Sequence, residues 1–246
     1  MMRLQKFIAK SGYTSRRKAE ILISEGKVKV NGLIITELGT QVDVVNDRVE
    51  IGGKRLQLEE NFVYVLLNKP TGVVSTVADQ FDRPTVLTCI KGINERIYPV
   101  GRLDYNTSGL LILTNDGDFT NRVTHPRYHV PKTYLVEAEG TLNVSDLDRL
   151  RHGVSIDDYK TQPALVKVVK EGKRGSVVEI TIHEGKNRQI RKMFEAINHP
   201  VLKLIRLKIG KIKDTDLSLG EWRYLRQDEI TYLKEYDNDT NCTSRK

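Results

Sequence analysis

A single aspartate lies in a turn-forming run that leads directly into an apolar segment. The stretch reads GRLDYNTSGLLILTNDG over residues 101–117, and Asp104 is followed there by Asn106, Ser108 and Gly109. An aspartate in such a run can close a turn by bonding its own backbone. It can also be a carboxylate held at the edge of a sheet, where it could act as a nucleophile. The residue types alone leave both interpretations open.

A cluster of cations follows a second strand-like segment. The stretch HEGKNRQIRKMFEAI, residues 183–197, leaves a strand and enters a helix. Arg188 and Arg191 are three residues apart, so we expect them to lie close together on the helix surface. Guanidinium groups in such a place can pair bidentately with a carboxylate or a phosphate. A solvated basic face would account for Lys186, but less well for two arginines that flank the apolar Ile190.

Other catalytic patterns are missing from the sequence. The five histidines include no pair four apart with a glutamate between them, which excludes a zincin site. The sequence has no P-loop, no dinucleotide fingerprint and no nucleophile elbow. Its two cysteines are far apart, which excludes a disulfide framework and a cysteine-based zinc site. We therefore expect neither a metal nor another cofactor.

Basic residues are concentrated in two segments of the chain. The net charge is +8 over 246 residues, but residues 1–32 alone carry +6 and residues 183–213 carry +7. The rest of the chain is therefore acidic. Such clustering is typical of a nucleic-acid-binding protein. Two solvated helical faces are the alternative, and an anionic membrane surface fits less well because neither segment is long and amphipathic enough.

The composition also indicates a cytoplasmic protein. An apolar fraction of 39% is enough to build a core, which argues against global disorder. The N-terminal MMRLQKFIAK lacks the apolar stretch of a signal peptide, and no segment approaches the ~18 apolar residues of a membrane span. The sparse cysteines fit a reducing compartment. We expect a monomer.

The first third of the chain predicts a small separate module. Apolar spacing predicts a helix over residues 4–12 and a second helix after it. Asn31 and Gly32 form a strong hairpin signal, and a second, weaker hairpin is expected over residues 42–58. The sequence EENF, residues 59–62, is the expected linker.

The second helix of this module begins in an unusual way. Ser15 is the expected N-cap, and Arg16, Arg17 and Lys18 then fall in the first turn. Cations are unfavourable there because the N-terminus of a helix is already positive. A phosphate bound from outside would compensate them.

The remainder predicts a larger α+β domain. Six long strands are expected, in FVYVLLNKP, GLLILTN, KTYLVEAEG, ALVKVVKEG, SVVEITIHEG and VLKLIRLKIG. Helices are expected near residues 117–125, 145–152, 187–197 and 227–236. Because strands and helices do not alternate regularly, we expect a mixed, mostly antiparallel sheet. The predicted division is a module over residues 1–60, a domain over residues 61–236, and a disordered tail over residues 237–246.

These motifs resemble those of the bacterial ribosomal pseudouridine synthases of the RsuA family, near its RluB branch. GRLDYNTSGLLILTNDG resembles the segment around that family's catalytic aspartate, PKTYLVEAEG the segment with its tyrosine, and HEGKNRQIRKMFEAI the segment with its arginine. NKPTGVVST and LGEWRYL match further segments, and the N-terminal module resembles an S4 RNA-binding domain. One departure is Asn198 before His199, where the family pattern has a glycine.

The resemblance implies that Asp104, Tyr134 and Arg191 are the catalytic residues. Pseudouridine formation breaks the C1′–N1 bond of a uridine, turns the base and rejoins it through C5. An adjacent carboxylate stabilises or attacks the positive C1′, so Asp104 would be either a nucleophile or a base. Arg191 would favour its ionised form. Tyr134 would offer an aromatic face to a base flipped out of its stack.

The resemblance also implies the partner and the contacts to it. The substrate would be ribosomal RNA; the expected target is the 23S RNA of the large subunit, with the 16S RNA as an alternative. RNA-binding residues would be Arg16, Arg17, Lys18, Lys69, Arg102, Lys186 and Arg188. A non-catalytic rRNA-binding assembly factor is the rival function, and the intact catalytic set argues against it. An S4-bearing tRNA synthetase would need a nucleotide-binding signature that the sequence lacks.

Overall fold

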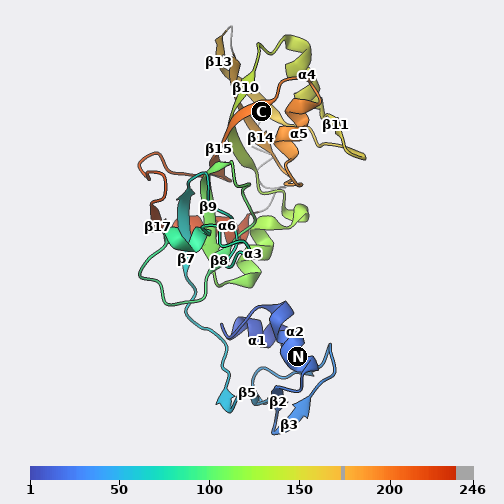
Figure 1. Cartoon of the computed structure of the whole chain (residues 1–246), viewed down its shortest axis with the longest axis vertical. Coiled ribbons are helices and arrows are strands. Elements are labelled where there is room, and N and C mark those ends of the chain that lie inside the picture. The colour runs from blue at the N-terminus through green and yellow to red at the C-terminus, as the bar shows by residue number, and fades with distance from the viewer. Residues whose placement is uncertain (173–174, 237–246) are drawn as a thin grey trace. The chain divides into compact units, whose positions relative to one another are not determined.

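The computed structural model describes residues 1–172 and 175–236, which form two compact units. The first unit comprises Met1–Val63 with the short segments Asn94–Ile97 and Asn115–Gly117, and the second unit comprises the rest. The tail expected over residues 237–246 lies outside the described residues. Figure 1 shows both units, and each is described here by itself.

The first unit is a small α+β module. Its elements are β1 (Met2–Arg3), α1 (Leu4–Lys10), α2 (Arg16–Ser24), β2 (Val28–Val30), β3 (Leu33–Ile35), β4 (Gln41–Val42), β5 (Val49–Ile51) and β6 (Lys54–Arg55). Four strands form an antiparallel sheet in the order β3-β2-β5-β6, and β1 pairs with β4. Buried apolar side chains of both helices and of β2, β4 and β5 form its core.

Local sequence signals account for most of this module. The Ser15 hydroxyl accepts a hydrogen bond from the backbone N–H of Lys18 at 3.2 Å, so the expected cap of α2 forms. Asn31 and Gly32 both have positive φ, as a two-residue hairpin turn requires, and they join β2 to β3. The second hairpin is shorter than expected, because Val42 pairs with β1 and only β5 and β6 form the hairpin.

The second unit is built on one nine-stranded sheet. Its strands are β7 (Tyr64–Lys69), β8 (Tyr98–Pro99), β9 (Ser108–Thr114), β10 (Lys132–Glu139), β13 (Leu165–Gly172), β14 (Gly175–Ile182), β15 (Val201–Ile209), β16 (Ile212–Lys213) and β17 (Trp222–Tyr224). The order is β13-β14-β10-β15-β9-β7-β17, with β16 beside β15 and β8 beside β9. Only the pair β9–β15 is parallel among the described strands of this sheet. The expected mixed, mostly antiparallel sheet is therefore confirmed, and so are all six long strands.

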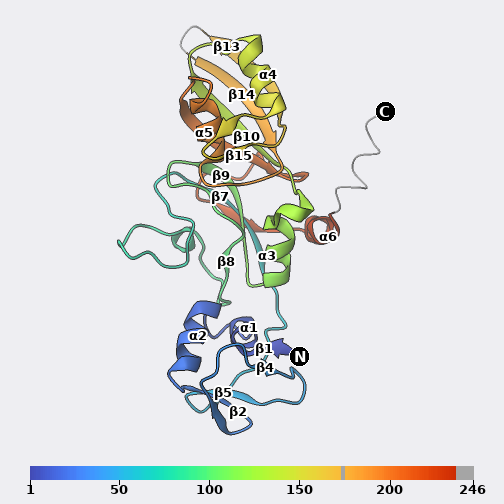
Figure 2. The ribbon, with the colours of Figure 1, turned by 90° about the vertical axis from the view of Figure 1, so that its right-hand side faces the viewer.

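Helices and short elements complete this unit. They are η1 (Val86–Cys89), α3 (Gly117–Thr124), η2 (Pro126–Tyr128), α4 (Val144–His152), the strand pair β11 (Ser155–Ile156) and β12 (Tyr159–Lys160), α5 (Gln189–Glu195) and α6 (Gln227–Glu235). Apolar side chains of α3 and α6 share one core with β7 and β9. Figures 1 and 2 show α4 and α5 beside the part of the sheet that contains β10 and β14.

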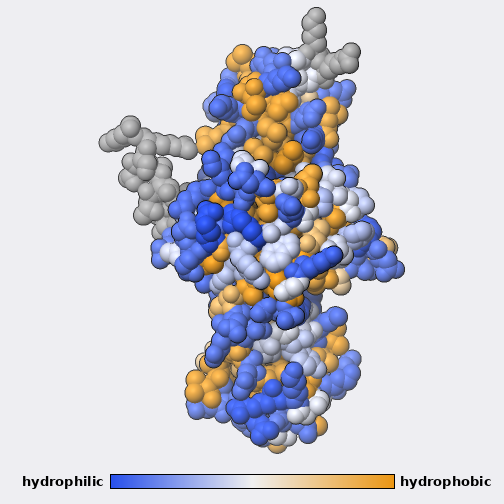
Figure 3. Space-filling view, turned by 90° about the vertical axis from the view of Figure 1, so that its left-hand side faces the viewer, coloured by the Kyte–Doolittle hydropathy of each residue, from blue (hydrophilic) through white to orange (hydrophobic). Residues whose placement is uncertain are grey.

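The burial of the strands follows their sequence patterns. All seven residues of β9 are buried, which explains its continuous apolar run. In β14 buried and half-buried residues alternate, as expected for an antiparallel strand with one covered face. Figure 3 shows a largely hydrophilic surface with hydrophobic side chains near the β13–β14 hairpin, where Leu165 and Val169 are exposed. No helix in the described residues is both long and apolar enough to cross a membrane.

A glycine allows the two parts of the sheet to meet. Gly109 of β9 pairs with Arg206 of β15 in the parallel ladder and has a φ of +108°. A Cβ atom at this position would lie only 2.3 Å from the Arg206 carbonyl oxygen. The close approach of β9 and β15 therefore requires glycine here, and it brings the turn before β9 next to β10 and β15.

Candidate active site

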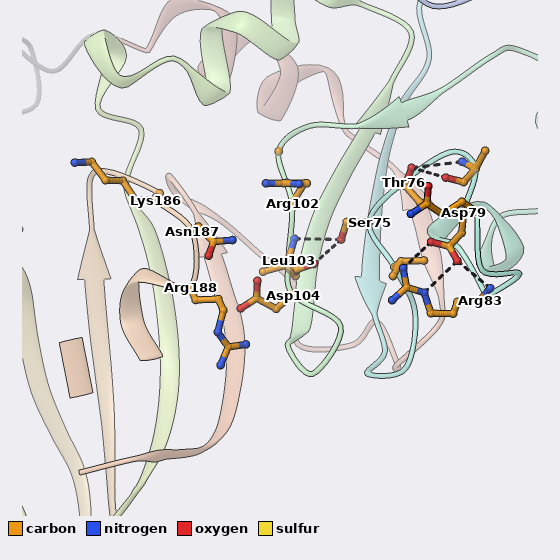
Figure 4. Close-up of a pocket in the computed structure, with 15 residues that line it drawn as sticks. Ser75, Thr76, Asp79, Arg83, Arg102, Leu103, Asp104, Lys186, Asn187 and Arg188 are labelled. Atoms are coloured by element: carbon orange, nitrogen blue, oxygen red, sulfur yellow. Dashed lines mark hydrogen bonds and ion pairs between the residues drawn. The ribbon is translucent and has the colours of Figure 1, made fainter. Parts of the chain in front are cut away.

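Asp104 lies in a turn whose backbone is held by hydrogen bonds from several elements. The carbonyl groups of five successive residues, 103–107, each accept at least one, and that of Asp104 also accepts the Thr107 N–H. The other donors are the Ser75 hydroxyl, the Gly72 N–H, the Lys69 ammonium and the Arg191 guanidinium. Figure 4 shows Ser75 bonded to Leu103, with the Asp104 side chain projecting from the next residue. Because these carbonyls are bonded, the backbone is fixed and the Asp104 side chain presents the free polar group.

Lys69 is buried, and its side chain donates hydrogen bonds to this turn. The residue is 0% exposed, and its Nζ donates to the carbonyls of Pro70, Asp104 and Thr107 at 2.9, 3.2 and 2.9 Å. The expectation that Lys69 contacts RNA is therefore wrong, because all three of its donors are occupied inside the protein. Burial lowers the pKa of Lys69 to about 8, while the nearby Asp104 carboxylate opposes that shift.

Arg191 of α5 lies beside the Asp104 carboxylate. It is 8% exposed, and its Nη1 and Nη2 donate to the carbonyls of Val201 and Asn106 at 3.2 and 3.0 Å. The remaining Nε has no partner and lies 3.9 Å from Asp104 Oδ2. Burial, and then Arg188, lower the pKa of the Arg191 guanidinium, whereas Asp104 raises it. The two groups therefore form an ion pair at a separation longer than a hydrogen bond.

Arg188 departs from its expected place on the helix surface. Helix α5 begins one residue later, and Arg188 is its N-cap with a left-handed φ of +51°. Gln189 causes this arrangement, because its Oε1 accepts the N–H of Lys186 and its Nε2 donates to Glu184. These bonds fold the loop back on the helix start. Arg188 therefore faces a cavity, while Arg191 is buried behind the turn.

Tyr134 of β10 meets Asp104 at a small cavity. Tyr134 is 9% exposed, pairs with Arg206 across the ladder, and accepts a hydrogen bond from Arg206 Nη1 at 3.5 Å. A cavity of about 80 Å³ is lined by Asp104, Tyr134 and apolar side chains that include Ile182 and Leu204. The fold thus brings together a carboxylate, an aromatic ring and apolar walls.

A larger cavity opens around the Asp104 carboxylate. Its volume is about 590 Å³, and Arg102, Lys186 and Arg188 line it together with Asp104. Figure 4 shows Lys186 and Arg188 on the loop before α5, across from Arg102 and Asp104. Four of the residues selected from the sequence therefore surround one space, and three of them are cations.

The other three selected cations belong to the first unit. Arg16, Arg17 and Lys18 are exposed in the first turn of α2, which contains no acidic residue. They are therefore accessible to a polyanion. Among the described residues, no group of three or more His, Cys, Asp or Glu side chains is placed to hold a metal ion.

Arg206 was not among the site residues expected from the sequence. This residue is 5% exposed, and its Nε donates to the Leu110 carbonyl at 2.6 Å, close to the turn that holds Asp104. A signal was available, because strand alternation places Arg206 on the same face as the apolar Leu204. Arginine is rarely buried unless it is paired, so an arginine at an inward position of a strand indicates a buried polar partner.

Comparisons with known proteins identify the family of the chain. The model of the RNA pseudouridylate synthase family matches residues 63–196, and the S4 domain model matches residues 2–49. The chain belongs to the RNA pseudouridylate synthase family. This pseudouridine synthase is 47% identical over 236 residues to the ribosomal large subunit pseudouridine synthase B of Bacillus subtilis, with 95% of this chain and 96% of that protein covered.

Two further relatives span similar lengths. An uncharacterized RNA pseudouridine synthase of Aquifex aeolicus is 43% identical, with 94% of this chain and 93% of that protein covered. A crystal structure of a pseudouridylate synthase superposes with a TM-score of 0.69 at 32% identity, covering 95% of this chain and 100% of that one. The family, the enzyme class and the S4 domain inferred from the sequence motifs are thus confirmed.

Proposed function

We propose that this pseudouridine synthase isomerises one uridine of the large-subunit ribosomal RNA. The observation that carries the proposal is the Asp104 carboxylate, which projects from a fixed turn beside Arg191 and shares a cavity with Tyr134. The name of the Bacillus subtilis relative supports the large-subunit target. The S4 domain and its exposed cations support an RNA substrate.

Asp104 acts at the ribose of the flipped uridine. Breaking the C1′–N1 bond leaves positive character on C1′ and negative charge on the uracil. The carboxylate either adds to C1′, and its bond to C1′ breaks when C5 attacks, or it takes a proton from the ribose and returns that proton when C5 bonds to C1′. Both roles require its ionised form. The uracil turns and rejoins C1′ through C5; C5 then loses its proton and N1 gains one. The product is an isomer of the substrate, so the atoms balance without a co-reactant.

The other residues position the base and the strand. Tyr134 packs its ring against the flipped uracil, and Arg191 holds the carboxylate in its ionised form. Arg102, Lys186 and Arg188 contact the RNA around the cavity, and guanidinium groups suit phosphate oxygens well. These roles rest on three observations: Arg102, Lys186 and Arg188 line the cavity around Asp104, Tyr134 lines the smaller cavity with Asp104, and Arg191 forms an ion pair with Asp104.

The two units divide the work. Residues 1–60 form the RNA-binding module, in which Arg16, Arg17 and Lys18 contact phosphates, and residues 61–236 form the catalytic domain. The enzyme works as a monomer in the cytoplasm, where its ribosomal substrate is made.

Mapping pseudouridines in ribosomal RNA tests the proposal. RNA from cells that lack the protein is compared with RNA from cells complemented with the wild type or with Asp104→Asn. We expect one large-subunit uridine to lose its modification, and only the wild type to restore it. A loss in the small-subunit RNA would overturn the proposed target. Unchanged modification of both RNAs would favour the non-catalytic assembly factor.

A further inference from the structure

A second cavity borders Tyr134 without including Asp104. Its volume is about 570 Å³, and it lies among the loop after β8, the start of β10, the β11–β12 pair and the segment after β14. The charged side chains that line it are Arg102, Lys132, Lys160, Lys186, Arg206 and Glu184. With five cations and one carboxylate, this cavity has a strongly positive lining that suits an anion.

Two of these cations flank the catalytic tyrosine on one face of the sheet. Lys132 precedes Tyr134 by two residues on β10, and Arg206 is the cross-strand partner of Tyr134 on β15. In the part of the chain that the structure describes, neither cation forms an ion pair with a carboxylate. Among residues 1–172 and 175–236, the single hydrogen bond of the Lys132 ammonium goes to the Val123 carbonyl, at 3.5 Å. Their positive charges are therefore uncompensated within the protein.

Burial and the neighbouring Arg206 both act on the pKa of Lys132. Burial lowers the pKa of Lys132 to about 8, and the positive charge of Arg206 lowers it further. Arg206 is also short of an acceptor, because its Nη2 is buried and has no hydrogen-bond partner. Leaving such a donor unsatisfied is costly. An oxyanion in the cavity would reduce the repulsion between the two cations.

We propose that Lys132 and Arg206 bind a phosphodiester group of the substrate RNA strand, a subsite that rests on the proposed function. Arg102 and Lys186 line both this cavity and the one around Asp104, so a single strand can pass from one to the other. Glu184 is the one carboxylate of the lining; its Oε1 accepts from Gln189 and from the Gln162 N–H, and among the described residues it forms no ion pair with Lys132 or Arg206. The phosphate contact would fix the strand beside Tyr134 while the neighbouring uridine is flipped.

A thermodynamic cycle between a protein change and a substrate change tests the subsite. The RNA is a large-subunit fragment in which single linkages on either side of the target uridine are replaced, one at a time, by uncharged methylphosphonates. Full-length wild type, Lys132→Met and Lys132→Arg are compared for dissociation constant and single-turnover rate. Lys170→Met, an exposed lysine of β13 outside the cavity, is the matched control for loss of one charge.

We expect one linkage at which the methylphosphonate weakens wild-type binding about tenfold, the effect of one charge-assisted hydrogen bond. In Lys132→Met, the methylphosphonate at that linkage should not weaken RNA binding further. In Lys132→Arg and in the control Lys170→Met, it should weaken binding as it does in the wild type. Additive effects at every linkage would overturn the subsite. Wild type that leaves the unmodified fragment unchanged would overturn the proposed function instead, so the two failures are distinguishable.

Two further arms define the source of the phosphate and the role of the charge. Inorganic phosphate, added at constant ionic strength, should not restore the RNA affinity that the methylphosphonate removes. If phosphate binds the wild type but no methylphosphonate changes its effect when Lys132 is replaced, the site binds free phosphate and the proposal is wrong. Between pH 7 and 9, wild-type affinity should decrease as Lys132 loses its proton, and Lys132→Arg should not show this decrease. The other titratable or charged groups facing the cavity, present in both proteins, are Arg102, His129, Tyr134, Tyr159, Lys160, His183, Glu184, Lys186 and Arg206. Parallel pH profiles would contradict the proposal.

Discussion

Replacing Gly109 by alanine should damage both the fold and the catalysis of the second unit. The added Cβ would lie 2.3 Å from the carbonyl oxygen of Arg206 and 2.5 Å from its backbone nitrogen. These are backbone atoms of a buried strand, so no side chain can rotate away. Strands β9 and β15 must therefore separate by about 1 Å to restore ordinary contact.

The magnitude follows from two terms. A φ of +108° is unfavourable for alanine and costs about 1–3 kcal/mol. Forcing the strands apart adds about 1–3 kcal/mol, as overpacking does elsewhere. We expect Gly109→Ala to lower the free energy of unfolding by about 2–6 kcal/mol. A shift of about 1 Å between Asp104 and Tyr134 should also slow turnover about 100-fold.

The assay is urea unfolding followed by the fluorescence of Trp222, the single tryptophan of the chain, which pairs with β7 in this unit. Gly92→Ala is the matched control, because Gly92 also has a positive φ but no atom within 4 Å of an added Cβ. Gly92→Ala should lose only the stability that a positive φ costs alanine, and it should keep near-wild-type turnover. If Gly109→Ala proved no less stable and no slower than Gly92→Ala, the role assigned to the close approach of β9 and β15 would be wrong.

The remaining predictions concern the turn, the RNA-binding module and metals. Lys69→Met should lower the free energy of unfolding by about 3 kcal/mol or more and abolish turnover, because the carbonyls of Pro70, Asp104 and Thr107 each lose a hydrogen bond from the buried ammonium; wild-type turnover would contradict this. Changing Arg16 and Arg17 together to alanine should weaken RNA binding and reduce the salt slope by less than ~1 per lost contact. Its single-turnover rate at saturating RNA should be unchanged, and slow turnover with normal binding would refute the proposed division of labour. Turnover should survive excess EDTA, provided that the RNA is shown to stay folded.

The sequence predicted the elements of the fold better than the packing of charged side chains. Strand β9 has a continuous apolar run and is buried throughout, whereas β14 alternates and is buried on one face. Ser15 caps a helix and Asn31-Gly32 forms a hairpin turn, and both act within a few residues. These signals are short-range, so the sequence carries them directly.

The errors concern contacts between distant segments. The resemblance implied that Lys69 contacts RNA, but its Nζ donates to carbonyls of residues 35 and 38 positions away. Arg188 was expected on the helix surface, but the Gln189 side chain starts the helix one residue later. Such placements depend on which segments the sheet brings together, and residue spacing does not contain that information.

Tritium release from an RNA labelled at C5 of uridine tests the central claim most directly. Wild type and Asp104→Asn are compared on a large-subunit fragment, with a parallel binding assay. Asparagine keeps the shape of the side chain but can neither attack C1′ nor accept a proton as a carboxylate does. We predict that Asp104→Asn binds the RNA nearly as wild type does and releases no tritium. Release at a rate near that of wild type would contradict the catalytic role of Asp104.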